Sequence, residues 1–248
     1  MSMPEDKLPP GFAPGPADAM LRRLGRLSFG PPVAYVYNPL EYARRGFETY
    51  CRRFGRAPKQ VVLVGMNPGP WGMAQTGVPF GEVDAVANWM KIDPGLQDLP
   101  RQHPKKPVLG LDCPRREVSG KRLWSWVRSR FGTPEAFFGR FFVVNYCPLM
   151  FLDEAGRNLP LDKLPAAARR PLLEICDQAL ADWIGYLEPE FVVGIGNFAH
   201  GRIAAALEGL PLTIGRITHP SPANPRANRG WAGAVEAELA RMGVMPLK

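Results

Sequence analysis

The chain has 248 residues, of which 46% are hydrophobic and 22% are charged. This composition is typical of a globular protein and argues against a disordered, a collagenous or a membrane-spanning chain. A total of 31 Lys and Arg against 23 Asp and Glu leaves a formal charge of +8, which favours anionic partners such as nucleic acid.

The four cysteines lie far apart in the sequence and form no CxxC pair; they are Cys51, Cys113, Cys147 and Cys176. The spacing typical of a zinc ribbon or an iron-sulfur cluster is therefore missing, and we expect neither a metal nor another cofactor. The N-terminus lacks the apolar stretch of a signal peptide, and no run approaches 18 apolar residues. We expect a protein of a reducing, cytosolic compartment that does not bind membranes.

In chain order, residues 1–17 carry five prolines, and we interpret them as a flexible leader before a single domain of residues 18–248. Apolar residues at spacings of three and four predict helices over residues 17–27, 40–54, 83–91, 121–131, 166–186, 198–207 and 231–242. Four short, continuous apolar runs predict strands buried on both faces, at residues 61–66, 141–146, 191–195 and 212–218. Residues 92–120, rich in Pro, Lys and Arg, are long enough for a functional loop.

Strands that alternate with helices predict an α/β fold, in which a mainly parallel four-stranded sheet lies between layers of helices. Ligands of such sheets bind beyond the carboxyl ends of the strands. Unusual sequences follow three of the four predicted strands: GMNPGPWGMAQTGVPFGEV at 65–83, NYCPLMF at 145–151 and HPSPANPRANRGW at 219–231.

The segment after the first strand contains five glycines and three prolines but a single charge. Its glycines let the main chain approach a ligand closely, and Asn67, which precedes Pro68, is biased toward an extended conformation that could aim it at a small site. The alternative is that Asn67 caps a turn. Phe80 and Trp71 could both pack beneath the loop. The alternative for Phe80 is that its ring stacks on a flat polar ligand.

Asn145, at the end of the second strand, carries an amide suited to reading the edge of a base, with a turn cap as the alternative. His219 follows the fourth strand and begins a rigid, basic, amide-rich loop that contains Arg226 and Arg229. We expect this loop to press on a phosphate backbone while His219 faces the same edge as Asn67 and Asn145. The alternative is a core histidine bonded to the backbone.

The sequence GIGNFA at 194–199 matches a dinucleotide fingerprint and opens a rival interpretation, an oxidoreductase. An acidic residue about 20 positions further on would then hold a ribose hydroxyl. Residues 209–230 contain no Asp or Glu, so close packing of a helix on the strand is the preferred explanation.

No Ser-His-Asp, Cys-His or paired-carboxylate constellation is evident in the sequence. Glu82 and Asp84 are interpreted as favourable charges at a helix N-terminus, and His103 and His200 as structural or surface residues. The predicted site offers amides and an imidazole instead of two carboxylates. Such a site suits a reaction in which the leaving group is already good and the protein stabilises charge, or a binding module that recognises a base without breaking a bond.

Taken together, GMNPGPWGMAQTGVPFGEV and HPSPANPRANRGW resemble the two signature motifs of the single-strand-selective monofunctional uracil-DNA glycosylases, family three of the uracil-DNA glycosylase superfamily. The resemblance covers residues from about 37 to 231, with NYCPLMF between the motifs. It implies the three-layer fold of that superfamily. It also implies hydrolysis of the N-glycosidic bond of uracil in DNA, in base excision repair, without cleavage of the strand.

By this resemblance, Asn67 holds the hydrolytic water and His219 stabilises charge on O2 of the departing base. The other roles that it implies concern the base: Asn145 reads uracil, Phe80 stacks on the flipped base, and Met66 and Gly69 line the pocket. The glycine at 69 implies room for 5-hydroxymethyluracil through a displaceable water.

Residues 222–229 match the family's wedge that enters the duplex, and the residues expected to contact DNA are Ser221, Pro222, Asn224, Arg226 and Arg229, with Arg226 at the tip. The wedge reads ANPRAN here, a departure that bears on its strength and strand preference. We expect a monomeric, bacterial-type enzyme of the cytosol or nucleoid that acts on single- and double-stranded DNA containing uracil. A glycosylase that prefers deaminated purines such as xanthine is the alternative within the superfamily.

Overall fold

The computed structural model describes residues 15–246, and the side chains of residues 18–246. Residues 1–14 of the predicted leader lie outside the described residues, whereas residues 15–17 already form the start of helix α1. The helix therefore begins inside the segment that we interpreted as a leader.

Helices separate the four central strands along the chain, as the pattern predicts. The helices are α1 (Gly15–Leu24), α2 (Pro39–Tyr42), α3 (Arg44–Phe54), α4 (Met73–Thr76), α5 (Val118–Phe131), α6 (Pro134–Phe138), α7 (Ala166–Leu187), α8 (Asn197–Ala206), α9 (Pro225–Asn228) and α10 (Trp231–Arg241). A π-helical turn covers Ala85–Trp89, and short 3-10 turns cover Gly110–Asp112 and Leu161–Lys163. The strands are β1 (Tyr35–Tyr37), β2 (Val61–Gly65), β3 (Phe141–Asn145), β4 (Met150–Leu152), β5 (Phe191–Ile195) and β6 (Thr213–Ile217).

Four parallel strands form the central sheet in the order β3-β2-β5-β6. Every residue of β2 and β5 is buried, as expected for strands with helices on both faces. The chain leaves β2 for β3 on one side and later reaches β5 on the other side, so the direction of the connections reverses next to β2. Sites of open α/β sheets lie beyond the carboxyl ends of the strands at such a reversal. The prediction of an α/β fold with a four-stranded parallel sheet is confirmed.

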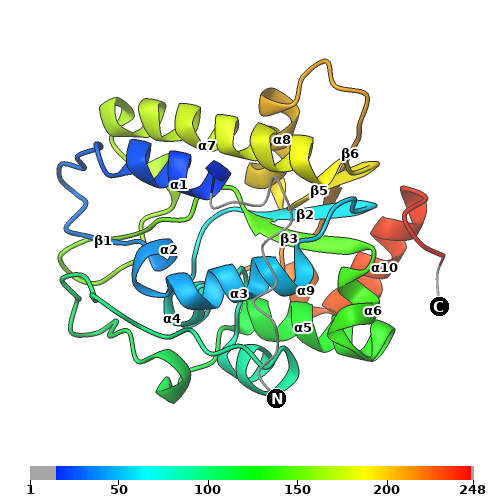
Figure 1. Cartoon of the computed structure of the whole chain (residues 1–248), viewed down its shortest axis with the longest axis horizontal. Coiled ribbons are helices and arrows are strands. Elements are labelled where there is room, and N and C mark those ends of the chain that lie inside the picture. The colour runs from blue at the N-terminus through cyan, green and yellow to red at the C-terminus, as the bar shows by residue number, and fades with distance from the viewer. Residues whose placement is uncertain (1–14, 247–248) are drawn as a thin grey trace, which may run out of the picture.

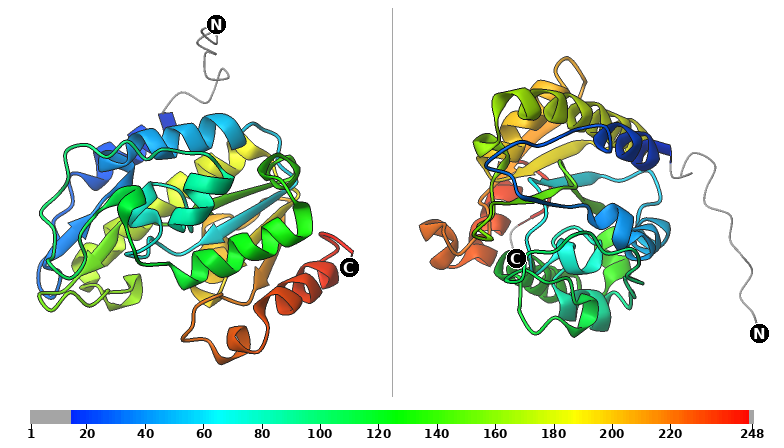
Figure 2. Two further views of the ribbon diagram at one scale, coloured as in Figure 1. Left: turned by 90° about the horizontal axis from the view of Figure 1, so that it is seen from below. Right: turned by 90° about the vertical axis from the view of Figure 1, so that its left-hand side faces the viewer.

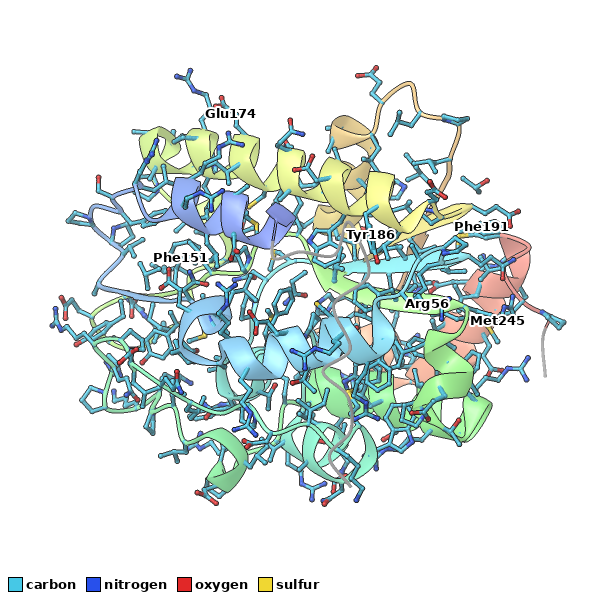
Figure 3. All side chains as sticks on the ribbon, viewed as in Figure 1. Arg56, Phe151, Glu174, Tyr186, Phe191 and Met245 are labelled. Carbon is cyan, nitrogen blue, oxygen red and sulfur yellow. The ribbon has the colours of Figure 1, made fainter. Side chains whose placement is uncertain are left out.

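Helices cover both faces of this sheet (Figure 1). Helices α1, α7 and α8 lie above the sheet in that view, and α5, α6 and α10 lie below it, an arrangement that the two views of Figure 2 also show. Figure 3 shows Glu174 projecting from the outer side of α7, away from the sheet. The two layers are held by one main apolar cluster that runs through the strands.

The edge strand β3 is protected by a tyrosine of α3. The hydroxyl of Tyr50 donates to the carbonyl of Val143 at 2.9 Å and accepts from the backbone N–H of Val143 at 3.3 Å. These bonds satisfy backbone groups that an open edge would expose, and Tyr50 is fully buried. The helix over residues 40–54 is predicted as continuous, but the structure divides it at Ala43, whose backbone has φ −115° and ψ 32°.

A small two-stranded antiparallel sheet of β1 and β4 was not predicted. Its strands have three residues each, too few for alternation to be recognised in the sequence. The four residues 146–149 connect β3 to β4, so the small sheet follows directly from the carboxyl end of β3. Figure 3 places Phe151 of β4 and Phe191, the first residue of β5, on opposite sides of the molecule.

The glycines of GIGNFA serve packing. A Cβ at Gly194 would lie 2.4 Å from the backbone nitrogen of His200 in α8, so this glycine lets α8 approach β5 closely. Close packing of α8 on β5 therefore explains why a glycine stands at 194, and no bound dinucleotide is needed to explain it. This agrees with the preferred explanation from the sequence.

The described residues include no helix that is both long and apolar enough to cross a membrane. Within the same residues, no three His, Cys, Asp or Glu side chains are grouped so that they could hold a metal ion. All four cysteines are buried free thiols.

Candidate active site

A cavity of about 260 Å³ opens beyond the carboxyl ends of the central strands. Gly65 of β2 pairs with Asn145 of β3 in the last register position of these strands, so the segments after both strands leave the sheet side by side. The cavity brings together every predicted catalytic and base-contacting residue and one residue expected to contact DNA: Met66, Asn67, Gly69, Phe80, Asn145, His219 and Ser221.

The side chain of Asn67 is fixed by the loop after β3. Its Nδ2 donates a hydrogen bond of 3.1 Å to the carbonyl of Leu149. The opposite end of the amide, Oδ1, accepts no hydrogen bond from any described residue and is a free acceptor beside the cavity. An amide held in this way can orient a water molecule but is too weak a base to deprotonate it.

His219 reaches the cavity across the end of β5, which separates β6 from β2 in the sheet. Gly196 makes this possible: it has φ +91°, and a Cβ there would lie 3.1 Å from Cβ of His219. The backbone N–H of Ser221 donates to Nδ1 of His219 at 3.1 Å. Burial lowers the pKa of His219 from its ordinary value. The imidazole is therefore neutral near pH 7 and carries its proton on Nε2.

Asn145 holds a buried acceptor that lacks a partner. Its Nδ2 contacts the sulfur of Met73 at 3.1 Å, whereas its Oδ1 is buried and makes no hydrogen bond within the described chain. A Cβ at Gly65 would lie 2.5 Å from this oxygen and 2.5 Å from Cε2 of Phe80, so Gly65 opens the space in which the amide and the ring meet. A buried acceptor without a partner is costly, and a ligand N–H would satisfy it.

Phe80 is held in a strained backbone conformation with φ +53°. Its carbonyl accepts hydrogen bonds from Nε1 of Trp124 at 2.9 Å and from the backbone N–H of Glu82 at 2.7 Å. The ring is partly exposed, and its centroid lies 6.5 Å from that of His219. Such strain persists only where the surroundings enforce it, and here it presents the ring to the cavity.

A carboxyl group, Glu117, also borders the cavity and was not predicted. A Cβ at Gly69 would lie 2.3 Å from Oε2 of Glu117, so the carboxyl occupies the space that a side chain at 69 would need. The sequence led us to expect only amides and an imidazole, and this expectation is wrong. Burial raises the pKa of Glu117 above its ordinary value. Glu117 lies in the predicted loop 92–120, and no local pattern relates it to Gly69.

Glu82 and His103 both have partners within the protein. Oε2 of Glu82 accepts from the backbone N–H of Ala85 at 3.1 Å, at the start of the π-helical turn. His103 is buried, and its Nδ1 accepts from the backbone N–H of Lys105 at 3.0 Å.

The predicted wedge is a structured loop that ends in helix α9. Asn224 caps α9 by accepting from the backbone N–H of Arg226 at 3.1 Å, and its Nδ2 donates to the carbonyl of His219 at 3.1 Å. Arg122 of α5 donates to the carbonyls of Pro220 at 2.9 Å and Ser221 at 3.3 Å. The amide of Asn224 is thus engaged within the protein and shapes the loop.

Arg226, Arg229 and Pro222 do not line the cavity but stand exposed on the loop beside it. The guanidinium of Arg226 is 71% exposed and lies 4.0 Å from the carboxylate of Glu238, a weak pair that leaves it available to a phosphate. Three further cavity residues had no distinctive sequence signal: Met73, Ser119 and Asn158.

Comparisons with known proteins show the family of this chain. The family model for the uracil DNA glycosylase superfamily matches residues 53–237. The chain is 44% identical over 260 aligned residues to the single-strand selective monofunctional uracil-DNA glycosylase of Rattus norvegicus, covering 96% of this chain and 94% of that protein. It is 46% identical to the protein of the same name from Mus musculus, covering 90% of this chain and 81% of that one.

Among solved structures, SMUG2 from Pedobacter heparinus superposes with a TM-score of 0.63 at 16% identity, covering 92% of this chain and 97% of that chain. This likeness concerns the fold alone. The fold that it shares with this chain includes the four-stranded parallel sheet described above only as part of the overall superposition, and the family assignment rests on the family match and the sequence relatives. The chain belongs to the uracil-DNA glycosylase superfamily and, within it, to the single-strand-selective monofunctional family.

Proposed function

We propose that this protein is a monofunctional DNA glycosylase that removes uracil from DNA and leaves an abasic site for base excision repair. The observation that carries the proposal is the buried, unpartnered Oδ1 of Asn145 in the same cavity as Phe80 and His219. Uracil has an N–H at position 3 that can satisfy this acceptor, and its flat ring can stack on Phe80. The names of the mammalian relatives support the same activity.

The proposed reaction depends on charge stabilisation. Uracil departs as an anion while the sugar becomes an oxocarbenium ion, so a donor at O2 strengthens in the transition state. The Nε2–H of neutral His219 supplies that donor. Asn67 orients the attacking water through Oδ1 while Leu149 fixes its Nδ2. Because neither group is a strong base, most of the rate enhancement comes from electrostatics.

We further propose 5-hydroxymethyluracil as a second substrate. The carboxyl of Glu117 lies where a side chain at Gly69 would stand, at the wall of the cavity. A carboxyl oxygen of this group can accept a hydrogen bond, and a substrate hydroxyl is a suitable donor.

The test is incubation of an end-labelled oligonucleotide that carries one uracil, followed by alkali. Wild type is expected to give an alkali-dependent cleavage product, and Asn67→Ala is expected to give none while retaining DNA binding. The matched control is Asn88→Ala, at an exposed asparagine remote from the cavity. A product with xanthine but not with uracil would support the deaminated-purine alternative. Binding without any product would support a recognition module.

We also propose that the protein acts as a monomer on both single- and double-stranded DNA, in the cytosol or nucleoid of a bacterium. The +8 charge and the basic loop 222–229 support contact with DNA in either form. Excision rates on matched single- and double-stranded substrates, with sedimentation of the protein at assay concentration, test the strand and monomer proposals.

A further inference from the structure

A second hollow, of about 470 Å³, lies beside the active-site cavity and is formed by Trp71 with the loop 104–115. We call it the Trp71 hollow. Prolines 104, 107 and 114 stiffen its rim, and its polar groups are the cations Lys105, Lys106 and Arg115. It belongs to the long basic segment whose role the sequence left open.

Three chain segments pass from the active-site cavity into the Trp71 hollow. Pro70 lines the cavity and Trp71 the hollow; Glu117 lines the cavity and Arg115 the hollow. On a third segment, Asn158 lines the cavity and Gly156 lines the hollow. The backbone N–H of Trp71 also lies 3.4 Å from Oε2 of Glu117. The two spaces therefore lie side by side and share a wall.

The cations of the hollow lack close carboxylate partners, although Lys106 is near enough to Glu117 for its charge to counter the rise in the pKa of that carboxyl. Lys105, Lys106 and Arg115 form no ion pair with any described residue, and Lys105 and Arg115 are exposed. Instead, Nζ of Lys106 lies 4.7 Å and Cζ of Arg115 lies 4.8 Å from the ring centroid of Trp71. Contacts between a cation and a ring are weak at exposed sites, so these side chains can turn to a phosphate.

We propose that the Trp71 hollow binds the single strand of DNA that flanks the target nucleotide. The strand's phosphates contact Lys105, Lys106 and Arg115, and one flanking base stacks on Trp71 as the cations move from the ring to the phosphates. A basic groove with an aromatic platform is the chemistry that single strands require. The inference rests on the proposed glycosylase function for the direction of the strand, since it assumes that the target base occupies the adjacent cavity.

The first test compares substrate lengths. Wild type is expected to excise uracil faster from a long single strand than from a trinucleotide with uracil at its centre. The double variant Lys105→Ala with Arg115→Ala should lose this advantage and match wild type on the trinucleotide. Oligonucleotides extended on only the 5′ side or only the 3′ side should show the loss on one side alone. The matched control, Arg52→Ala with Lys163→Ala, removes the same charges from exposed positions elsewhere and should behave as wild type.

The second test measures binding without chemistry, by fluorescence anisotropy of a labelled uracil-free strand over a range of salt. Loss of two phosphate contacts should reduce the slope of log Kd against log salt by about 1.4. Trp71→Ala should weaken binding by about tenfold, and Trp71→Phe should restore most of it because a phenyl ring also stacks.

The inference is overturned if the double variant keeps the wild-type length advantage and salt slope, or if the control pair loses as much. Failure of the proposed function looks different. In that case wild type releases no base from any substrate, yet the anisotropy comparison still decides whether the Trp71 hollow binds a strand.

Discussion

The backbone N–H of Ser221 donates to Nδ1 of His219 over 3.1 Å, and this single bond leaves Nε2 to carry the proton of the neutral imidazole. Protonation of Nδ1 would require this bond to break. Burial acts in the same direction, because it lowers the pKa of His219. The loop that follows β6 therefore both positions the histidine and keeps it neutral.

A pH profile tests this arrangement. Excision by wild type should be constant above the pKa of His219 and should fall at pH values below it, at a midpoint lower than 6.5. The fall arises because the imidazolium cannot accept from Ser221 and moves from its position. Single-turnover rates from about pH 5 to about pH 8 measure this. His219→Gln keeps a neutral donor, and its excision rate should be about 10²-fold below that of wild type and should not fall at low pH. A wild-type rate that rises as the pH falls would contradict a neutral His219.

Replacement of Asn145 by Leu should separate activity from stability. Asn145→Leu removes a buried acceptor that has no partner, so the free energy of unfolding should rise by about 1 kcal/mol. The same change removes the groups that read the base, and kcat/KM for uracil should fall by about 10²-fold. Urea denaturation and excision assays on one preparation measure both effects. Asn88→Leu, at an exposed position, removes a hydrogen bond to Asp84 and should leave kcat/KM unchanged. A less stable Asn145→Leu protein would show that the amide has a structural partner.

Gly69 and Glu117 should behave as a coupled pair. Gly69→Ala introduces a Cβ 2.3 Å from Oε2 of Glu117 and should destabilise the fold by about 1 to 3 kcal/mol. Glu117→Ala removes the obstacle, so the double variant should recover much of that loss. A double-mutant cycle of unfolding free energies measures the coupling, with Gly185→Ala, which meets nothing within 4 Å, as the control. Additive effects would mean that the carboxyl moves aside freely.

Arg122 should matter for duplex DNA more than for single strands. Arg122→Ala frees the carbonyls of Pro220 and Ser221, so the wedge loop loses the contact that orders it. A disordered loop must be ordered when it enters a duplex, and the double- to single-strand excision ratio should fall by about tenfold. Arg128→Ala on the same helix, which removes the pair with Asp84, is the control. An equal loss on both substrates would place Arg122 in the reaction rather than in strand opening.

The four central strands could be predicted because burial on both faces makes each one a continuous apolar run, as in Val61–Gly65. Asn67, Asn145 and His219 could be placed at one edge for the same reason, since parallel strands end together. Their meeting in one cavity is observed, whereas their chemical roles stay predictions until the variants are assayed.

Other features depend on contacts between distant segments. Glu117 borders the site only because α5 begins beside the loop 65–72, a neighbourhood that no spacing encodes. The two-stranded sheet depends on the pairing of Tyr37 with Met150 across more than a hundred residues. The break at Ala43 interrupts a sequence with unbroken helical periodicity, so it arises from tertiary packing.

Helix α5 carries contacts to three parts of the site at once. Its N-cap residue Glu117 lies against Gly69. Arg122 donates to the carbonyl of Pro220 in the loop that leads to the wedge, and Trp124 donates to the carbonyl of Phe80. Because one helix makes all three contacts, a shift of α5 would move these three parts of the site together. A base stack that displaces the loop should therefore also displace the ring of Phe80 and the cavity wall at Glu117. Unstacking of the target base and its enclosure in the cavity would then occur together.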